Sequence, residues 1–156
     1  MSAFAIDPQT GVWLRGRFDF LSPGQGVGDY KTAADGEPGK FARRTMLDLG
    51  YHVQAAHYLD LAAAVGLADP DAPFRFIVQE KAAPYLVSVV TVGDDYLALG
   101  RHDMRRAIDL WARCQTTGVW PGYPSITAEP PRWAVDDMFS ELDPSIEDEF
   151  AALLNH

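Results

Sequence analysis

The sequence predicts an α/β (α+β) protein whose central mixed β-sheet is flanked by helices. Two observations point to this fold class. Runs rich in β-forming residues occur as two pairs along the chain, and segments with helical periodicity follow each pair. With 156 residues the chain is also long enough to bury a core, at about two-thirds of its unfolded surface.

The first half of the chain is expected to form a hairpin followed by two helices. Residues 12–21 and 26–32 are rich in β-formers and are separated by a Pro/Gly-rich turn, which predicts two paired strands. A short helix is expected over residues 40–49, and Gly50 is its predicted stop signal. A second helix is expected over residues 51–65, with apolar residues along one side.

The second half is expected to begin with two more strands, at residues 74–80 and 85–92. A long helix then follows, with Asp94-Asp95 as its predicted cap and its end at about Thr117. The buried stripe of this helix is predicted to consist of Leu97, Met104, Ile108, Leu110 and Trp111.

A change of composition near residue 129 predicts two regions, a domain over residues 1–128 and an acidic helical tail over residues 129–156. The tail contains eight Asp or Glu residues and a single Arg, so it contributes about −7 of the net charge of −9. Residues 133–142 and 145–154 are either two short helices or a segment that becomes ordered only on a partner.

Composition also limits the location of the protein. Cys114 is the only cysteine, which excludes an internal disulfide and a cysteine-based zinc site. No apolar run reaches the length of a membrane span, and the N-terminus shows no secretory signal. We therefore expect a cytoplasmic protein that does not act in a membrane.

Two aspartates and a lysine are the main candidates for a catalytic centre. Strand alternation places Asp29 and Lys31 on one face, about 6–7 Å apart, and the hairpin can bring Asp19 beside Asp29. The two carboxylates and the backbone carbonyl of Tyr30 are suitable ligands for Mg²⁺, and the lysine can orient an attacking water. The alternative is a solvated Asp–Lys pair on an exposed hairpin.

Gln54 and Tyr58 are the second candidate feature. They lie one helical turn apart and therefore on the same helix face, where an amide and a phenol can approach a scissile phosphate. The alternative is an ordinary amphipathic helix with a half-buried tyrosine. The order of the motifs, two hairpin carboxylates, Asp-x-Lys and then Gln-x-x-x-Tyr, is much rarer than any one of them.

Basic residues surround the proposed centre, although the whole chain is acidic. The candidates for contacts with the DNA backbone are Arg15, Arg17, Lys40, Arg43 and Arg44. A solvated helix face is the alternative for the last three. Glu80 and Lys81 are interpreted as structural residues, because they lie too far along the chain to replace the Asp29-x-Lys31 motif.

These motifs together resemble the PD-(D/E)xK nuclease superfamily. The similarity covers roughly residues 12–124 and is closest to the RecB-like and lambda-exonuclease-like branch, including the C-terminal domain of exodeoxyribonuclease VIII. Its main segments are Gly16-Arg-Phe-Asp19, Asp29-Tyr-Lys-Thr32, Gly50-Tyr-His-Val-Gln-Ala-Ala-His-Tyr58 and Phe76-Ile-Val-Gln-Glu-Lys81.

The resemblance implies a restriction-endonuclease-like core and a Mg²⁺- or Mn²⁺-dependent exonuclease that degrades double-stranded DNA in phage-type recombination. It implies Asp19 and Asp29 as metal ligands, Lys31 as a catalytic residue, and Gln54 and Tyr58 as supporting residues. Because the family works beside a strand-annealing protein, residues 133–156 are a candidate segment for binding such a partner or a sister subunit of a homo-oligomer.

One departure from the family pattern concerns the metal site. The family has a further helix upstream of its first aspartate, and that helix supplies another metal ligand. Only 18 residues precede Asp19 here, so a core that lacks or truncates its first helix is expected. A weakly active or inactive binding remnant of the same fold, and an endonuclease of the same superfamily, are therefore the rival hypotheses.

Overall fold

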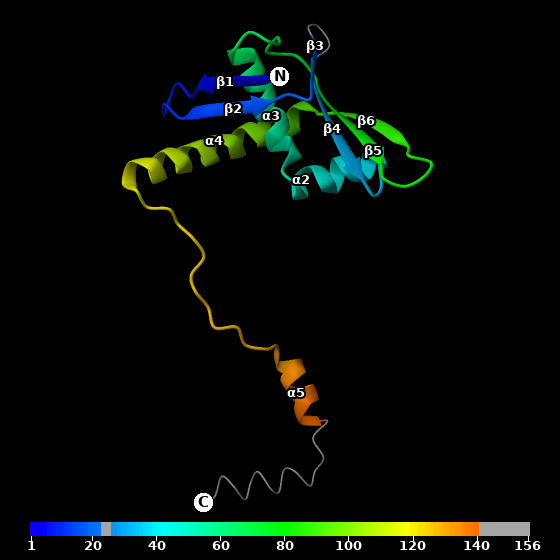
Figure 1. Ribbon diagram of the computed structural model, residues 1–156, viewed down its shortest axis with the longest axis vertical. Coiled ribbons are helices and arrows are strands. Elements are labelled where there is room, and N and C mark those ends of the chain that lie inside the picture. Colours follow the sequence, from blue (N-terminus) through cyan, green and yellow to red (C-terminus); the bar gives the residue numbers. More distant parts are fainter. Residues whose placement is uncertain (23–25, 141–156) are drawn as a thin grey trace, which may run out of the picture. The chain divides into compact units, whose positions relative to one another are not determined.

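The computed structural model describes residues 1–22 and 26–140 of the chain (Figure 1). The chain divides into two compact units, Met1–Trp120 and Pro121–His156. The second unit contains helix α5 (Arg132–Ser140), which overlaps the first of the two helices predicted for the tail. The second predicted tail helix lies outside the described residues. The domain boundary at residue 128 remains a prediction.

The first unit contains two sheets. A two-stranded hairpin pairs β1 (Ser2–Ile6) with β2 (Trp13–Arg17) in antiparallel fashion. A four-stranded sheet has the order β3-β4-β5-β6, formed by β3 (Phe20–Ser22), β4 (Gly26–Ala33), β5 (Phe74–Glu80) and β6 (Val87–Thr91). Because β4 and β5 are parallel and the outer pairs are antiparallel, the sheet is mixed, as the sequence predicts.

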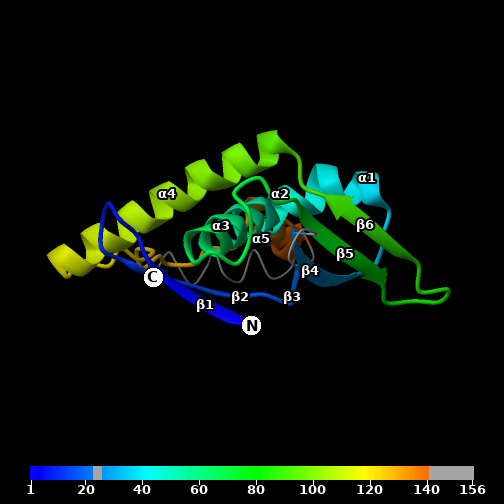
Figure 2. The same ribbon diagram turned by 90° about the horizontal axis from the view of Figure 1, so that it is seen from above.

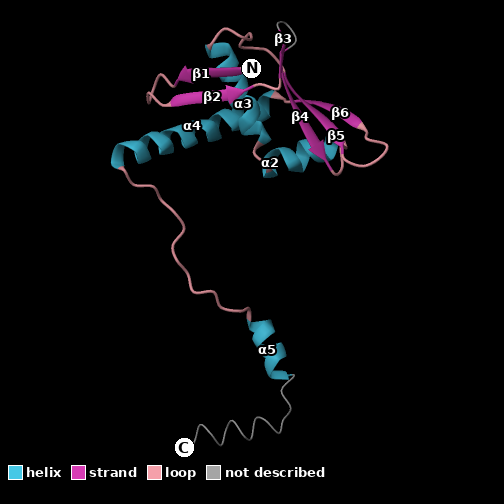
Figure 3. Ribbon diagram, viewed as in Figure 1, coloured by secondary structure: helices cyan, strands magenta, loops and turns pink. Residues whose placement is uncertain are grey.

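Helices form the connection from β4 to β5 and follow β6 (Figure 3). One continuous helical segment consists of α1 (Pro38–Lys40), a π-helical turn labelled η1 (Phe41–Thr45) and α2 (Met46–Asp48). It is followed by α3 (Tyr51–Ala64), and α4 (Asp94–Thr117) completes the unit. The carboxylate of Glu37 accepts hydrogen bonds from the backbone N–H groups of Gly39 and Lys40, which satisfies the free donors at the start of α1.

Two strand predictions differ from the structure. The single strand expected over residues 12–21 is two strands in different sheets, because the chain leaves the hairpin at Phe18 and enters the larger sheet at Phe20. The side chain of Phe18 is buried at this break and packs edge-on against Tyr58 of α3, with ring centroids 5.2 Å apart. The strand β1 was not predicted from the sequence.

Helix α4 differs from prediction at its cap and its buried face. Gly93 is the N-cap, and Asp94 and Asp95 lie in the first turn, where they favour the helix through its dipole. The side chains of Leu110 and Trp111 are 42% and 49% exposed, so they do not belong to the buried stripe. Ile108 is buried as predicted, Leu97 and Met104 are half-buried, and Gly100 and Cys114 are buried in addition.

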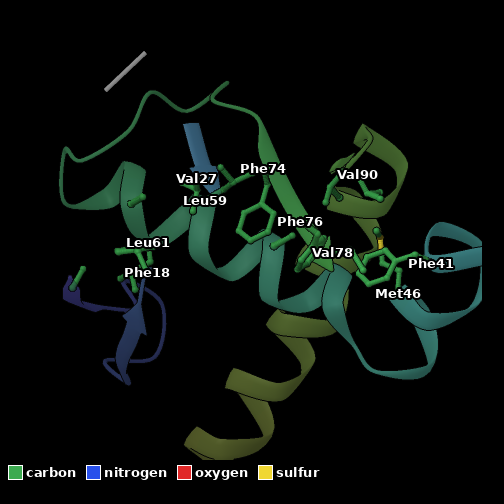
Figure 4. Close-up of a cluster of buried hydrophobic side chains, with 14 residues drawn as sticks. Phe18, Val27, Phe41, Met46, Leu59, Leu61, Phe74, Phe76, Val78 and Val90 are labelled. Atoms are coloured by element: carbon green, nitrogen blue, oxygen red, sulfur yellow. The ribbon is translucent and has the colours of Figure 1, made fainter. Parts of the chain in front are cut away.

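The core lies between one face of the four-stranded sheet and the helices above it. Buried residues at alternate positions of the strands, Val27, Phe74, Phe76, Val78 and Val90, contact buried side chains of α3, η1 and α2 (Figure 4). Leu61 and Phe18 lie at one end of this cluster, and Phe41 and Met46 lie at the other. The opposite face of the sheet carries Phe20, Tyr30, Val87 and Val89, each about half exposed.

Helix α3 lies between α4 and the β1–β2 hairpin (Figure 2). Two glycines allow these close approaches. A Cβ atom at Gly100 of α4 would lie 2.2 Å from the carbonyl oxygen of His52, and one at Gly16 of β2 would lie 2.7 Å from Leu61. The tight packing fixes the position of α3, which carries Gln54 and Tyr58.

A partly buried ion pair joins the hairpin to α4. The guanidinium of Arg105 donates to both carboxylate oxygens of Asp7 at 2.8 and 3.1 Å, and the backbone N–H of Thr10 donates to the same carboxylate at 2.9 Å. The hydrogen bonds from Arg105, and after them those from Thr10, lower the pKa of Asp7 to about 2 despite its burial. The charged form of Asp7 therefore stabilises the fold.

The variant Asp7→Asn is expected to lower the free energy of unfolding at pH 7 by about 2–3 kcal/mol, because Arg105 loses its buried carboxylate partner and keeps only the exposed one, Asp109. A carboxyl whose pKa is lowered on folding stabilises the protein above its unfolded pKa of about 3.9. The difference between variant and wild type should therefore shrink as the pH falls towards about 2. Urea unfolding of both proteins at pH 7 and at pH 3 measures this difference in unfolding free energy. An equal difference at the two pH values would contradict a stabilising role of the Asp7 charge.

Candidate active site

Strand β4 places Asp29 and Lys31 on the face of the sheet that α3 covers. Alternation along the strand sends both side chains to this inner face, while Tyr30 points to the opposite face and is 48% exposed. Asp29 is 4% exposed, so its carboxylate is one of the few buried charged groups among the described residues. A buried charge needs partners, and both of its partners here come from the predicted motifs.

The side chains of Asp29, Lys31 and Gln54 form a closed triad. The amide nitrogen of Gln54 donates to Oδ1 of Asp29 at 2.6 Å, and Nζ of Lys31 donates to the amide oxygen of Gln54 at 3.0 Å. An ion pair of 2.6 Å between Nζ of Lys31 and Oδ2 of Asp29 closes the ring. The Asp-x-Lys and Gln-x-x-x-Tyr motifs therefore meet in space, although about 25 residues separate them.

The ammonium of Lys31 lies in an aromatic environment. It is 4.5 Å from the ring centroid of Tyr51 and 5.8 Å from that of Phe76, within the range of cation–π interactions. The Lys31 side chain is only 20% exposed. The triad therefore fixes the position of its one cation in a partly desolvated site, where electrostatic interactions are stronger than in water.

Asp19 lies at the free edge of β4 beside Asp29. The β3–β4 pairing places Phe20 opposite Gly28, so one further step of the same register places Asp19 opposite Asp29. The carboxylate of Asp19 is exposed and accepts a hydrogen bond of 3.3 Å from the backbone N–H of Tyr30. Because the N–H and C=O groups of one strand residue point to the same side, the Tyr30 carbonyl is also directed to this edge.

The oxygen atoms of Asp19, Asp29 and the Tyr30 carbonyl are chemically suited to bind a hard divalent cation such as Mg²⁺ or Mn²⁺. Oδ2 of Asp29 is buried and accepts no hydrogen bond among the described residues; Lys31 neutralises it only as an ion pair. Asp19, Asp29 and the Tyr30 carbonyl can supply two or three oxygen ligands. In the described part of the chain, no three or more Asp, Glu, His or Cys side chains are grouped so that they could hold a metal ion together.

A cleft of about 730 Å³ opens beside Lys31, and we call it the basic cleft. The strand end of β4, the segment from α1 to α2 and the start of α3 form its walls. Five cations and one carboxylate are the charged residues that line it: Lys31, Asp35, Lys40, Arg43, Arg44 and Lys81. Excess positive charge in a concave site is suited to a polyanionic ligand.

The cations of the basic cleft are not equivalent. Lys40 forms an ion pair with Asp35, whose hydrogen bond raises the pKa of Lys40, and the same hydrogen bond lowers the pKa of Asp35. Backbone N–H donors lower the pKa of the Glu37 carboxylate, and Arg43 lies close enough to lower it further. Arg44 and Lys81 form no ion pair with any residue that the structure describes. Arg44 and Lys81 are therefore the cations of the cleft most available to an external phosphate.

The remaining predicted residues lie elsewhere around the site. Arg15 and Arg17 are exposed on the face of β2 that points away from α3, so the structure separates them from the basic cleft. Tyr58 lies one turn beyond Gln54, with its ring against Phe18 and Phe74. No hydrogen bond within the described ranges links its hydroxyl to the triad.

Lys81 is a site residue that sequence reasoning missed. Parallel pairing places Ala33 opposite Glu80, and the backbone N–H of Lys81 donates to the carbonyl of Ala33 at 3.0 Å. This pairing brings Lys81 into the basic cleft, 50 positions after Lys31 in the sequence. No local pattern signals such a contact. Glu80 has the structural role expected, since its carboxylate accepts the backbone N–H of Gly36 at 3.0 Å.

Comparisons with known proteins bear on the family and the fold of this chain. The family model described as "PDDEXK-like domain of unknown function (DUF3799)" matches residues 2–129. The crystal structure of a protein named "Putative exonuclease" from Eubacterium rectale has a TM-score of 0.65 and 16% identity, and the match covers 91% of this chain and 56% of that chain. The present chain thus spans little more than half of that protein. No curated protein matches the sequence.

The structural similarity at this level of identity establishes the fold, and the family model establishes the family. Together they confirm the resemblance to the PD-(D/E)xK nuclease superfamily and support a function of nuclease type. No helix in the described residues is long and apolar enough to cross a membrane. The chain belongs to the family described as the PDDEXK-like domain of unknown function.

Proposed function

We propose that the protein is a metal-dependent DNA exonuclease that hydrolyses phosphodiester bonds of double-stranded DNA. The observation that carries this proposal is the Asp29–Lys31–Gln54 triad, with Asp19 beside it and with Lys31 lining the basic cleft. Phosphodiester hydrolysis requires a site for a divalent cation, a group near the attacking water and positive charge along the DNA backbone. The three requirements correspond to three adjacent parts of this site.

Asp19, Asp29 and the Tyr30 carbonyl would hold Mg²⁺ or Mn²⁺, which when bound lowers the pKa of a water molecule and neutralises charge on the phosphate. Lys31 contributes the fixed ammonium. Held by Asp29 and Gln54, it can donate to the attacking water or to a phosphate oxygen as negative charge develops there. Gln54 acts as a positioning residue, because its amide bonds to both partners and keeps their relative orientation.

The basic cleft would bind the DNA strand on one side of the reacting phosphate. Lys40, Arg43, Arg44 and Lys81 can contact several phosphates, and such contacts carry no sequence information. This arrangement favours a nuclease without marked sequence preference. Arg15 and Arg17, on a separate element, can contact a more distant part of the backbone. A role in phage-type recombination, and a strand-annealing partner or sister subunit at residues 133–156, belong to this proposal as well.

A substrate comparison tests the proposal. The purified chain is incubated with linear duplex DNA and with a covalently closed circle of the same sequence, with Mg²⁺, with Mn²⁺ or with chelator. An exonuclease degrades the linear DNA alone and only with a metal ion. Cleavage of the circle would instead assign an endonuclease. Calorimetric titration with Mg²⁺ completes the test, because a chain that neither binds the ion nor cuts DNA would be a binding remnant of the fold.

A further inference from the structure

A second hollow of about 740 Å³ borders the triad on its other side, and we call it the aromatic groove. It lies between the β1–β2 hairpin, α3 and the second half of α4. The residues that matter for the following argument are Trp13, Gln54, His57, Tyr58, Trp111 and Gln115. No Asp, Glu, Lys or Arg side chain is among the described residues that line it.

One face of α3 connects the aromatic groove to the basic cleft. Tyr51 lines the basic cleft, Gln54 belongs to the triad and lines the aromatic groove, and Tyr58 lines the groove one turn further on. Positions separated by three, four and seven residues share a helix face. The two hollows therefore follow each other along α3, with the reacting centre between them.

Two tryptophan side chains of the groove are largely exposed and are not part of the buried core. Trp13 is 69% exposed and Trp111 is 49% exposed, although both are large apolar side chains. Trp120 packs edge-on against Trp111, with centroids 5.0 Å apart at 73°, and this contact limits the rotation of the Trp111 ring. Aromatic rings held in this way are suited to stacking on planar groups such as nucleobases.

Two cations lie on the outer face of β2, next to the residue that forms the edge of the groove. Trp13, Arg15 and Arg17 occupy alternate positions of β2, so their side chains share one strand face. The imidazole Nε2 of His57 donates to the backbone carbonyl of Arg15 at 3.0 Å and joins this strand to α3. This face points away from α3, so Trp13 lies at the outer edge of the groove, and a strand that stacks a base there can continue along β2 towards Arg15 and Arg17.

We infer that the aromatic groove binds unpaired nucleotides of the substrate strand, with bases stacked on Trp13 and Trp111 and phosphates contacted by Arg15 and Arg17. This inference rests on the proposed nuclease function. A base inside a duplex is already stacked and paired, so it reaches such a surface only after leaving the helix. The protein would thus engage a frayed end or a single-stranded overhang, with its backbone continuing from the groove past the triad into the basic cleft.

Binding measured in the absence of metal tests this inference without cleavage. Fluorescence anisotropy in chelator compares three labelled ligands of equal length, a single strand, a strand of abasic nucleotides and a blunt duplex. The wild-type protein is expected to bind the normal strand about 10-fold or more tightly than the abasic strand. It is also expected to bind the normal strand more tightly than the blunt duplex.

Variants separate base stacking from phosphate contact. The double variant Trp13→Ala/Trp111→Ala should bind normal and abasic strands equally, while its salt dependence stays that of the wild type. The variant Arg44→Ala should weaken binding to both strands equally and reduce the salt slope by about one. Tyr123→Ala, which changes a fully exposed aromatic residue outside both hollows, is the control and should behave as the wild type.

Each result has a defined meaning. A tryptophan double variant that still distinguishes the two strands would overturn the inference, as would a wild type that fails to distinguish them or binds neither. A change in self-association of the double variant, without a change in base preference, would make the groove a protein contact instead. Metal-dependent cleavage is scored separately, so loss of the groove assignment leaves the proposed nuclease standing, and base-dependent binding without cleavage overturns only the nuclease.

Discussion

Replacement of Asp29 by asparagine is expected to reduce metal-dependent cleavage of linear duplex DNA by about 10³-fold or more. Asparagine has nearly the same shape and can still interact with Gln54, but it carries no charge to hold a divalent cation. The loss should therefore be catalytic, with the secondary structure of the variant unchanged. The measurement is the initial rate of release of acid-soluble nucleotides at saturating Mg²⁺, together with circular dichroism of both proteins.

The exposed carboxylate of Asp48, at the end of α2 and outside the basic cleft, provides the matched control. Asp48→Asn removes the same charge from the same unit and should cleave DNA at the wild-type rate. If Asp29→Asn also cleaves at the wild-type rate, the assignment of this carboxylate to the reaction is wrong. Calorimetry adds a second readout, because Mg²⁺ affinity should fall in Asp29→Asn and remain unchanged in the control.

Replacement of Lys31 by methionine is expected to lower turnover by about 10²-fold or more, because the fixed ammonium near the attacking water is lost. Methionine keeps an apolar stem against the ring of Tyr51, so the packing changes little. Affinity for Mg²⁺ should stay the same or increase. The reason is the 2.6 Å ion pair, in which the lysine occupies the same carboxylate oxygen of Asp29 that a cation would use.

A magnesium titration of the cleavage rate distinguishes these two effects. The Lys31→Met variant should reach a low plateau, with half-saturation at or below the wild-type concentration. A rate that recovers fully at high Mg²⁺ would show that Lys31 serves only the metal site. The melting temperature with and without Mg²⁺ gives an independent check. In Lys31→Met the buried Asp29 carboxylate has lost its ion-pair partner, so added Mg²⁺ should raise the melting temperature of the variant more than that of the wild type.

Local patterns were sufficient for most of the elements and for the faces of the site residues. The period of two residues in a strand places Asp29 and Lys31 on one face, and the helical period places Gln54 and Tyr58 on another. Apart from the strand expected over residues 12–21 and the tail helix outside the described residues, the predicted helices and strands occur within a few residues of their expected bounds, and the predicted mixed sheet is confirmed. Each of these features depends on neighbours close in sequence.

The predictions that failed concern contacts between distant segments. Periodicity cannot show that the chain changes sheet at Phe18, since the residues on both sides of it favour β-structure equally. Periodicity also cannot show that the side chains of Leu110 and Trp111 remain about half exposed, because it does not reveal where the surface packed against α4 ends. A helix pattern indicates which side is apolar, but the partner surface decides how much of that side is buried.

The sequence by itself determined the order of the elements, the family resemblance and the residue types of the candidate centre. Tertiary structure decided which of these residues meet. Gln54 bonds to both Asp29 and Lys31 because α3 packs on the inner face of β4, and Lys81 enters the basic cleft because β5 pairs in parallel with β4 in one register. Strand register and helix packing follow from the burial of the whole core, which no local segment encodes alone.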